Sequence, residues 1–319
     1  MAKSIGTHLL NGVRGCLIGT AEVVPGISGG TVALITGVYE TLINSAGHVV
    51  SGTRMLVTDL VRGRGPARAR EEFGRADWGA VLALLAGMAV AVLTAARIIA
   101  PLVESHPSES YALFFGLVLA SLWVPYSGSG RRWRIGDYLL ALVMAAAAFL
   151  LTGLPPTQVE PNPLIVMGAA SVAICALVLP GISGSFILLT LGLYTVTMDA
   201  VNNRDLGYIA TFALGAIVGL ALFVKLLQWL LDRFHHLTLV VMTGLMAGSL
   251  RSLWPWQDGD RTLLAPDPGN LVLCVVLALV GAAAVIAVML VEHRLKARAA
   301  HGALAAAAPT SREDDEVVR

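Results

Sequence analysis

The chain has 319 residues, of which 56% are hydrophobic and 13% charged, and its formal net charge is +1. A soluble domain carries about 25% charged residues, so the composition excludes an ordinary soluble protein and indicates an integral membrane protein. Cys16, Cys175 and Cys274 lie scattered in apolar runs, which argues against a disulfide framework and a metal site. We expect no cofactor and no nucleic-acid partner.

The first apolar region, residues 12–46, is interrupted by Pro-Gly-Ile-Ser-Gly-Gly at residues 25–30. Proline lacks an N–H group and glycine favours a turn, so a helix should end there. The flanking pieces are shorter than the roughly 20 residues that a membrane crossing needs. We therefore expect a re-entrant helical hairpin. A second hairpin is expected at residues 164–200, which are interrupted by Pro-Gly-Ile-Ser-Gly-Ser at residues 180–185.

Six other segments are apolar and long enough to cross a bilayer. The expected spans are residues 78–100, 109–126, 136–154, 207–231, 237–254 and 271–292. Between the first hairpin and the first span lies a basic stretch, residues 51–76, which we expect to be a cytoplasmic loop. The Ala-rich tail at residues 297–319 ends in an acidic run and is expected to be disordered.

The two broken regions belong to an internal repeat. Pro25, Ser28, Gly37 and Tyr39 recur 155 residues later as Pro180, Ser183, Gly192 and Tyr194, whereas Arg97 and Gly116 recur 128 residues later as Lys225 and Gly244. Each repeat, residues 1–158 and 159–296, then holds one hairpin and three spans. Because three is odd, the second repeat should be inverted in the membrane. The predicted fold is an all-α polytopic membrane protein of two inverted repeats.

The distribution of charge fits this topology if both termini are cytoplasmic. The expected inner loops hold most of the arginines, including those of residues 54–75 and 131–134, whereas the outer loops are mainly acidic. This is the positive-inside pattern of membrane proteins. The predicted location is a cell membrane, crossed several times, and the oligomeric state stays open.

The two breaks are candidate anion sites. A broken helix exposes the N–H groups of its second half, and these donors together with the helix dipole favour an anion such as phosphate. Hydroxyl groups and glycines gather there, namely Ser28, Gly29, Gly30, Thr31, Ser183, Gly184 and Ser185. The alternative is close helix packing, for which small residues are common in membrane proteins.

Four ionisable residues lie inside apolar segments, where charges usually face a cavity or a partner. Arg14 and Glu22 are eight residues apart on one helix and form either a structural ion pair or part of the site. Arg97 and Lys225 either reach their nearest interfaces or bind a head group, one in each leaflet. His235 and His236 are interpreted as solvated loop residues.

Gly26-Ile27-Ser28-Gly29-Gly30 also matches the G-x-S-x-G pattern of serine hydrolases. A nucleophilic serine needs a base within hydrogen-bonding distance, and no histidine lies inside an expected span. We therefore expect no catalytic residue, although an intramembrane serine hydrolase stays a remote alternative. A purely structural assembly factor is a further one.

The run from Glu22 to Thr31 with Gly37-Val38-Tyr39-Glu40, and the second run Leu179–Phe186 with Leu191-Gly192-Leu193-Tyr194, resemble two signatures of one bacterial membrane family. This family, once known only as a domain of unknown function, is the PopT-type polyprenyl-phosphate translocases. The resemblance covers most of residues 10–292 and leaves out the basic stretch and the acidic tail.

The resemblance implies a flippase that returns undecaprenyl phosphate from the outer to the cytoplasmic leaflet of the bacterial membrane, for recycling in cell-wall synthesis. In that function Arg14, Arg97 and Lys225 would bind the phosphate, the break residues would donate hydrogen bonds, and Glu22 would couple protons. A secondary transporter of a small soluble anion is the main alternative.

Overall fold

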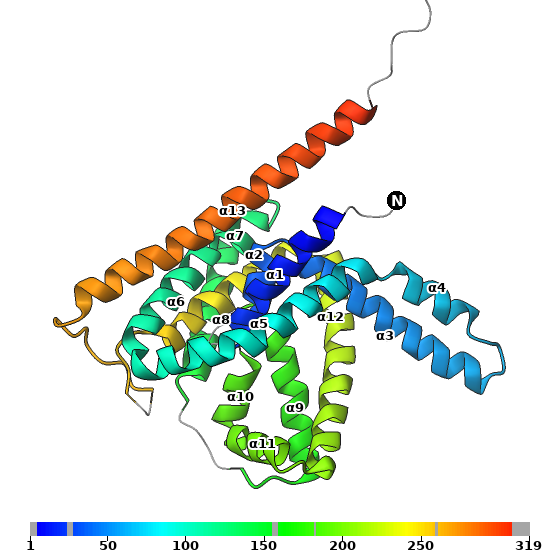
Figure 1. Cartoon of the computed structure of the whole chain (residues 1–319), viewed down its shortest axis with the longest axis horizontal. Coiled ribbons are helices and arrows are strands. Elements are labelled where there is room, and N and C mark those ends of the chain that lie inside the picture. The colour runs from blue at the N-terminus through cyan, green and yellow to red at the C-terminus, as the bar shows by residue number, and fades with distance from the viewer. Residues whose placement is uncertain (1–4, 24–27, 155–158, 182, 259–260, 308–319) are drawn as a thin grey trace, which may run out of the picture.

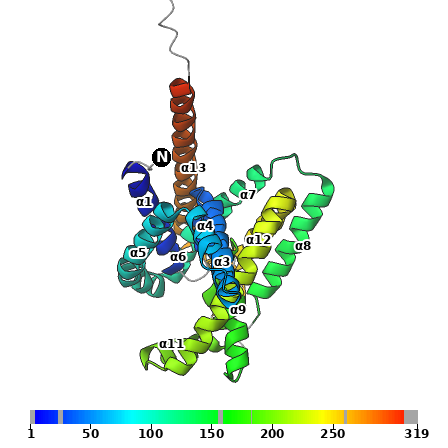
Figure 2. The ribbon, with the colours of Figure 1, turned by 90° about the vertical axis from the view of Figure 1, so that its right-hand side faces the viewer.

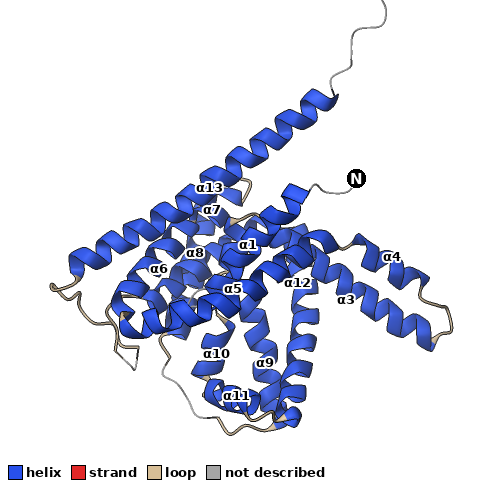
Figure 3. Ribbon diagram, in the orientation of Figure 1, coloured by secondary structure: helices blue, strands red, loops and turns tan. Residues whose placement is uncertain are grey.

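The computed structural model describes residues 5–23, 28–154, 159–181, 183–258 and 261–307 (Figure 1). Within these ranges the secondary structure is helical apart from one isolated β-bridge between Gln257 and Leu263 (Figure 3). The predicted all-α fold class is therefore confirmed.

The first half of the chain begins with two helices around the first break and continues through the basic stretch to three apolar segments. Its helices are α1 (Ile5–Val23), α2 (Gly29–Ile35), α3 (Tyr39–Val61), α4 (Ala67–Arg75), α5 (Trp78–Ser105), α6 (Pro107–Ser121), α7 (Trp123–Gly128) and α8 (Ile135–Thr152). The second half repeats this order without a counterpart of α4. Its helices are α9 (Pro163–Val178), α10 (Gly184–Thr190), α11 (Leu193–Asn202), α12 (Leu206–Ser249), the 3-10 helix η1 (Leu250–Leu253) and α13 (Leu271–Ala307).

Among the described residues, five helical stretches are long and apolar enough to cross a membrane, and the bent pair α10–α11 would make a sixth. They are Trp78–Val103, Pro107–Gly128, Ile135–Thr152, Leu206–Leu253 and Leu271–Arg294. The chain is thus a multi-pass membrane protein, as predicted. The expected spans 207–231 and 237–254 are the two arms of α12, which is interrupted at Phe234 (φ −132°, ψ 40°).

Both broken regions contain a second bend that the sequence analysis missed. A helix of seven residues, α2 or α10, follows each break. Two residues after it ends comes a glycine with left-handed backbone, since Gly37 and Gly192 both have φ 69°. Glycine adopts this conformation without steric cost. At the second of these bends the chain turns by 109° between α10 and α11. Each predicted two-helix hairpin is therefore a three-helix unit.

Glycines set the packing of the first span in each half. A Cβ atom on Gly87 of α5 would overlap the carbonyl oxygen of Gly12 in α1. Likewise, a Cβ atom on Gly215, in the first arm of α12, would overlap the carbonyl oxygen of Met167 in α9. Gly215 follows Gly87 by 128 residues and Met167 follows Gly12 by 155, which are the two offsets of the sequence repeat. Equivalent helices thus pack through equivalent positions.

The remaining spans pair across the two halves. Helix α6 packs against α13, where Gly116 lies on the backbone of Ala278. The second arm of α12 packs against α8, where Gly244 lies on the backbone of Ala141, and Figure 2 shows this pair side by side. Because each half supplies one helix to each pair, the halves interlock.

Residues 51–76, expected as a loop, are mostly helical. Helix α3 continues to Val61 and α4 folds back on it, with Gly52 against the ring of Phe73, so that the pair projects from the body in Figure 1. His48 Nδ1 lies 2.9 Å from Glu72 Oε2. This hydrogen bond, with the nearby charge of Arg75, holds the pKa of Glu72 below its ordinary value. Helix α4 is rich in Ala, Arg and Glu, which favour helices, and this contact ties it to α3.

The C-terminal tail also differs from expectation. Helix α13 continues to Ala307, so the prediction of disorder from residue 297 is wrong for residues 297–307. Alanine has the strongest intrinsic helix propensity, which explains why an Ala-rich segment extends the helix. Residues 308–319, which include the acidic run, lie outside the described part of the chain.

Candidate functional site

The first break lies directly against the second one. Ser28 is the N-cap of α2, and its Oγ accepts a hydrogen bond from the Gly30 N–H at 3.2 Å. The same hydroxyl donates to the carbonyl oxygen of Leu179 at 3.0 Å. Leu179 immediately precedes Pro180 of the second break, so residues about 150 positions apart meet in the interior. Of the first break, Pro25, Gly26 and Ile27 lie outside the described residues.

Two further side chains tie the first broken region to the second. Thr31 Oγ1 accepts a hydrogen bond from the Gly181 N–H at 3.0 Å, and both groups are buried. Tyr39 donates from its hydroxyl to the carbonyl oxygen of Val178 at 3.1 Å. These contacts occupy backbone groups that the end of α9 leaves without helical partners. In this conformation the side chains of Ser28 and Thr31 therefore pack the two broken regions together.

The second break makes no matching set of contacts within the described residues. Ser183 Oγ lies 2.8 Å from Ser185 Oγ, and Gly184 packs on α9, where an added Cβ would lie 2.5 Å from the Ala173 carbonyl oxygen. Tyr194, which corresponds to Tyr39, is 38% exposed, whereas Tyr39 is 4% exposed. The first broken region is thus hydrogen-bonded to the other half, whereas Ser183 is buried but bonds within its own break and Tyr194 is exposed.

A carboxylate of the chain itself occupies the position predicted for an anion at the first break. Glu22 Oε1 accepts a hydrogen bond from the Gly29 N–H at 2.8 Å. Gly29 is the first residue of α2, where free N–H groups favour negative charge. Glu22 is therefore placed to compete with any other anion for this donor.

Arg14 is paired with Glu292 of α13, so the interpretation that it pairs with Glu22 is wrong. Arg14 Nε and Nη2 donate to Glu292 Oε1 at 2.9 and 2.7 Å, and Arg14 Nη1 donates to Asn11 Oδ1 at 3.1 Å. The two charged side chains are 16% and 10% exposed. Arg14 and Glu22 are separated by two helical turns of α1, and each has found a partner on a different element.

Arg97 and Lys225 lie away from both breaks. Arg97 is exposed on α5 and has no hydrogen bond or ion pair within the described part of the chain. Lys225 donates to Gln228 Oε1 at 3.1 Å, and Gln228 in turn bonds to Asn44 of α3. No described contact joins either cation to a break. Arg97 and Lys225 occupy equivalent positions in the sequence repeat, but their surroundings in the structure differ.

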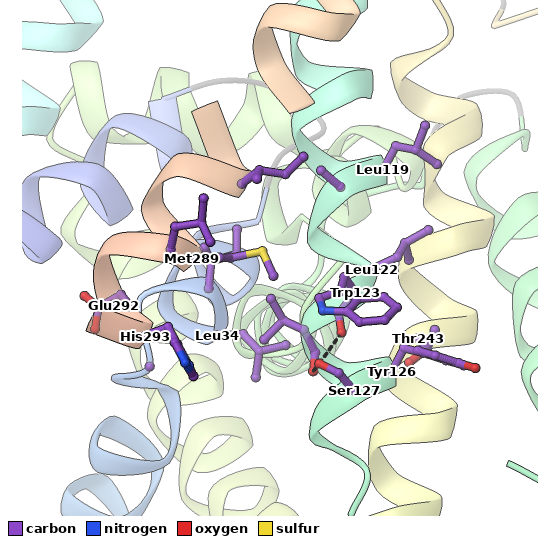
Figure 4. Close-up of a pocket in the computed structure, with 16 residues that line it drawn as sticks. Leu34, Leu119, Leu122, Trp123, Tyr126, Ser127, Thr243, Met289, Glu292 and His293 are labelled. Carbon is purple, nitrogen blue, oxygen red and sulfur yellow. Dashed lines mark hydrogen bonds between the residues drawn. The ribbon is translucent and has the colours of Figure 1, made fainter. Parts of the chain in front are cut away.

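A cavity of about 940 Å³ opens beside Glu292, the partner of Arg14 (Figure 4). Its walls come from α2, the α6–α7 segment, the second arm of α12 and α13. Most lining side chains are apolar, such as Leu34, Leu119 and Met289, and Figure 4 shows Glu292 and His293 together at one side. A cavity of this kind suits a ligand with a long apolar part.

A smaller cavity of about 200 Å³ lies between α1, α2, α6 and α13, and its lining is apolar apart from the hydroxyls of Thr20 and Thr36. Ile35 of α2 borders both cavities. The short helix after the first break is thus the partition between them.

Sequence reasoning did not find Glu292, His293 or the wall formed by α7. Glu292 is the last residue of the expected span 271–292 and had no role in the sequence prediction. A carboxylate at the end of a strongly apolar helix was the available signal. Its partner could not be inferred because 278 residues separate it from Arg14.

Comparison with known proteins places this chain in a family. Residues 18–268 match the family model described as VCA0040-like, undecaprenyl phosphate translocase-like. A polyprenyl-phosphate transporter of Vibrio cholerae serotype O1 is 35% identical over 258 residues, which cover 81% of each chain. A polyprenyl-phosphate transporter of Staphylococcus aureus is 25% identical over 268 residues, covering 77% of this chain and 86% of that protein.

No solved structure matches the chain. The matched residues include both breaks and all candidate spans except the last, so the resemblance seen in the two signature motifs is confirmed. The chain belongs to the undecaprenyl phosphate translocase-like family.

Proposed function

We propose that this protein is a flippase that moves undecaprenyl phosphate from the outer to the cytoplasmic leaflet of the bacterial cell membrane. The observation that carries the proposal is the large, mostly apolar cavity lined at one side by Glu292, whose partner Arg14 lies behind it. An isoprenoid chain needs an apolar path, and its phosphate needs a cation. The relatives named polyprenyl-phosphate transporters support this choice of substrate.

In the proposed mechanism the lipid phosphate replaces Glu292 as the partner of Arg14. A guanidinium group binds a carboxylate or a phosphate through the same pair of N–H donors. Glu292 keeps Arg14 neutralised while the site is empty, because an unpaired charge in an apolar interior is costly. Protonation of Glu292 would weaken the pair and favour the exchange.

The breaks supply the moving parts in this proposal. Ser28 and Thr31 hold the first broken region closed on the second, with Gly30 packed on the carbonyl of Val178, while Gly29 binds Glu22. Among the described residues, Ser183 and Ser185 make no side-chain hydrogen bond to the other half, and with Gly184 they are the proposed phosphate donors in the second break. One broken region would be bonded to the other half while the second is not. If the two inverted halves exchanged these states, the site would open to each leaflet in turn.

Inward movement of a negative charge opposes a negative-inside potential by about 2.3 kcal/mol per 100 mV. Co-transported protons would offset this energy. Glu22 is the proposed carrier, because its protonation would free the Gly29 N–H for the phosphate.

Arg97 and Lys225 are proposed to attract the head group at the two membrane surfaces. Both termini are proposed to be cytoplasmic, from the distribution of arginines.

The alternatives fit less well. A small soluble anion would not need a cavity of about 940 Å³ lined mostly by apolar side chains. A serine hydrolase would need a base near Ser28, but the described hydrogen-bond partners of its hydroxyl are backbone groups of Gly30, Leu177 and Leu179.

A vesicle assay tests the proposal. Undecaprenyl phosphate with a radioactive phosphate is placed in both leaflets, and phosphatase added outside releases label only from the outer leaflet. Vesicles with the protein should lose all label, whereas protein-free vesicles should protect the inner-leaflet fraction. Radioactive inorganic phosphate should stay outside both. If vesicles with the protein protect as much label as protein-free vesicles, lipid transport is refuted. Uptake of inorganic phosphate would favour the alternative of a soluble-anion transporter.

A further inference from the structure

The interruption of α12 at Phe234 is followed at once by two histidines that bind the end of α7. His235 Nε2 lies 3.3 Å from the carbonyl oxygen of Gly128. His236 Nδ1 lies 3.1 Å from the carbonyl oxygen of Ser129. A carbonyl oxygen only accepts hydrogen bonds, so each of these ring nitrogens carries a proton.

The two histidines differ in what lies near their second ring nitrogen. His236 Nε2 lies 3.1 Å from Asp137 Oδ2, and the two side chains are 12% and 7% exposed. A carboxylate also offers only acceptors, so His236 faces an acceptor at each nitrogen. Neutral imidazole has one N–H group, and only the imidazolium ion has two. His236 Nε2 makes no hydrogen bond to this carboxylate in the present geometry, so it is the ion pair with Asp137 that requires the charged form, whereas the single contact of His235 needs one proton.

The Asp137 carboxylate is held in place from its own helix. It sits in the first turn of α8, where Oδ2 accepts a hydrogen bond from the Arg134 N–H at 2.8 Å. Arg131 Nη2 lies 3.9 Å from Oδ1. Asp137 and Arg131 are thus the charged groups that α8 and the turn before it place at His236, and His235 is the neighbouring titratable group on α12.

This contact joins two walls of the large cavity. Tyr126 and Ser127, from α7, line one wall just before Ser129, and Thr243 lines another on the second arm of α12. The interruption at Phe234 gives α12 a place to bend, and there Thr238 Oγ1 bonds to the carbonyl oxygens of Leu230 and Phe234. A bond between α12 and the end of α7 therefore links, beside the bend, the two elements that carry these walls.

We propose that His236 is a proton-binding site: when charged, its ion pair with Asp137 fastens the second arm of α12 to the α7–α8 turn, and when neutral it loses that ion pair and keeps only the weaker bond to Ser129. The weakened attachment lets α12 bend at Phe234 and lets the two cavity walls separate. Only the consequence for lipid transport rests on the proposed function; the proton-dependent movement itself does not.

The test measures a distance and needs no substrate. Spin labels are placed on exposed positions, Arg132 in the α7–α8 turn and Leu222 in the first arm of α12, in full-length protein with its three native cysteines replaced by alanine. Distance distributions are recorded in lipid at about pH 5.5 and about pH 8.5, on either side of the ordinary histidine titration. We expect a second distance population to appear at the higher pH.

Three variants make the result specific. His236→Gln should abolish the pH-dependent change, and His235→Gln, the matched control, should leave it intact. Asp137→Asn keeps an acceptor for the Arg134 N–H and should move the change to lower pH. An unchanged distance in the parent protein, or a change that survives His236→Gln, would overturn the proposal. Because no lipid transport is measured, failure of the proposed function would not alter this outcome.

Discussion

Arg14→Gln is expected to abolish transport of undecaprenyl phosphate in the vesicle assay and to destabilise the protein. The substitution leaves the carboxylate of Glu292, which is 10% exposed, without its guanidinium partner. Removal of one member of a buried ion pair costs about 3–5 kcal/mol, because the remaining charge is uncompensated. Thermal unfolding in detergent and the release of protected label measure the two effects separately.

The double variant Arg14→Gln/Glu292→Gln separates stability from function. With both charges removed, most of the lost stability should return, whereas transport should stay absent because no cation receives the phosphate. Glu292→Gln alone leaves Arg14 free, so undecaprenyl phosphate should raise its melting temperature more than that of the parent protein. Transport by the double variant at the parent rate would show that Arg14 does not bind the substrate.

Thr31→Val is expected to lower the unfolding free energy by about 1–3 kcal/mol, the usual cost of a buried donor left without a partner. The change keeps the shape of the side chain but removes the acceptor for the Gly181 N–H. It should also slow transport, because it loosens the contact that closes the first broken region. Thermal unfolding and the vesicle assay, run on the same preparation, measure both.

Thr36→Val is the matched control. Thr36 is as buried as Thr31, but its hydroxyl donates within α2, to the carbonyl oxygens of Val32 and Ala33. The Val32 oxygen still accepts the Thr36 N–H after the change, so no buried group loses its only partner. Equal stabilities of the two variants would mean that the bond between the breaks does not hold the halves together.

The membrane architecture could be read from the sequence because it follows from local properties. Hydrophobic length predicts spans, and proline with glycine predicts breaks, wherever the residues sit in the fold. The expected spans fall on α5, α6–α7, α8, both arms of α12 and α13. The offsets of 155 and 128 residues likewise reappeared in the packing of Gly87 and Gly215.

The site depended on tertiary contacts that local patterns do not encode. Arg14 had a plausible partner eight residues away, but the fold places Glu292 of α13 nearer. His236 looked like a solvated loop residue because the chain around it is polar, yet the α7–α8 turn covers it. The helices at residues 51–76 were missed for the same reason, since they are stabilised by contacts with each other.

The central claim is that the isoprenoid chain occupies the cavity between α2, α7, α12 and α13. An undecaprenyl phosphate analogue with a photoreactive group near the end of its chain tests this directly, with the labelled residues identified by mass spectrometry. We predict labelling at cavity residues such as Leu34, Trp123 and Met289, and its loss on Met289→Trp, which fills the cavity. Labelling confined to α9, α10 and the first arm of α12, unaffected by Met289→Trp, would contradict the claim.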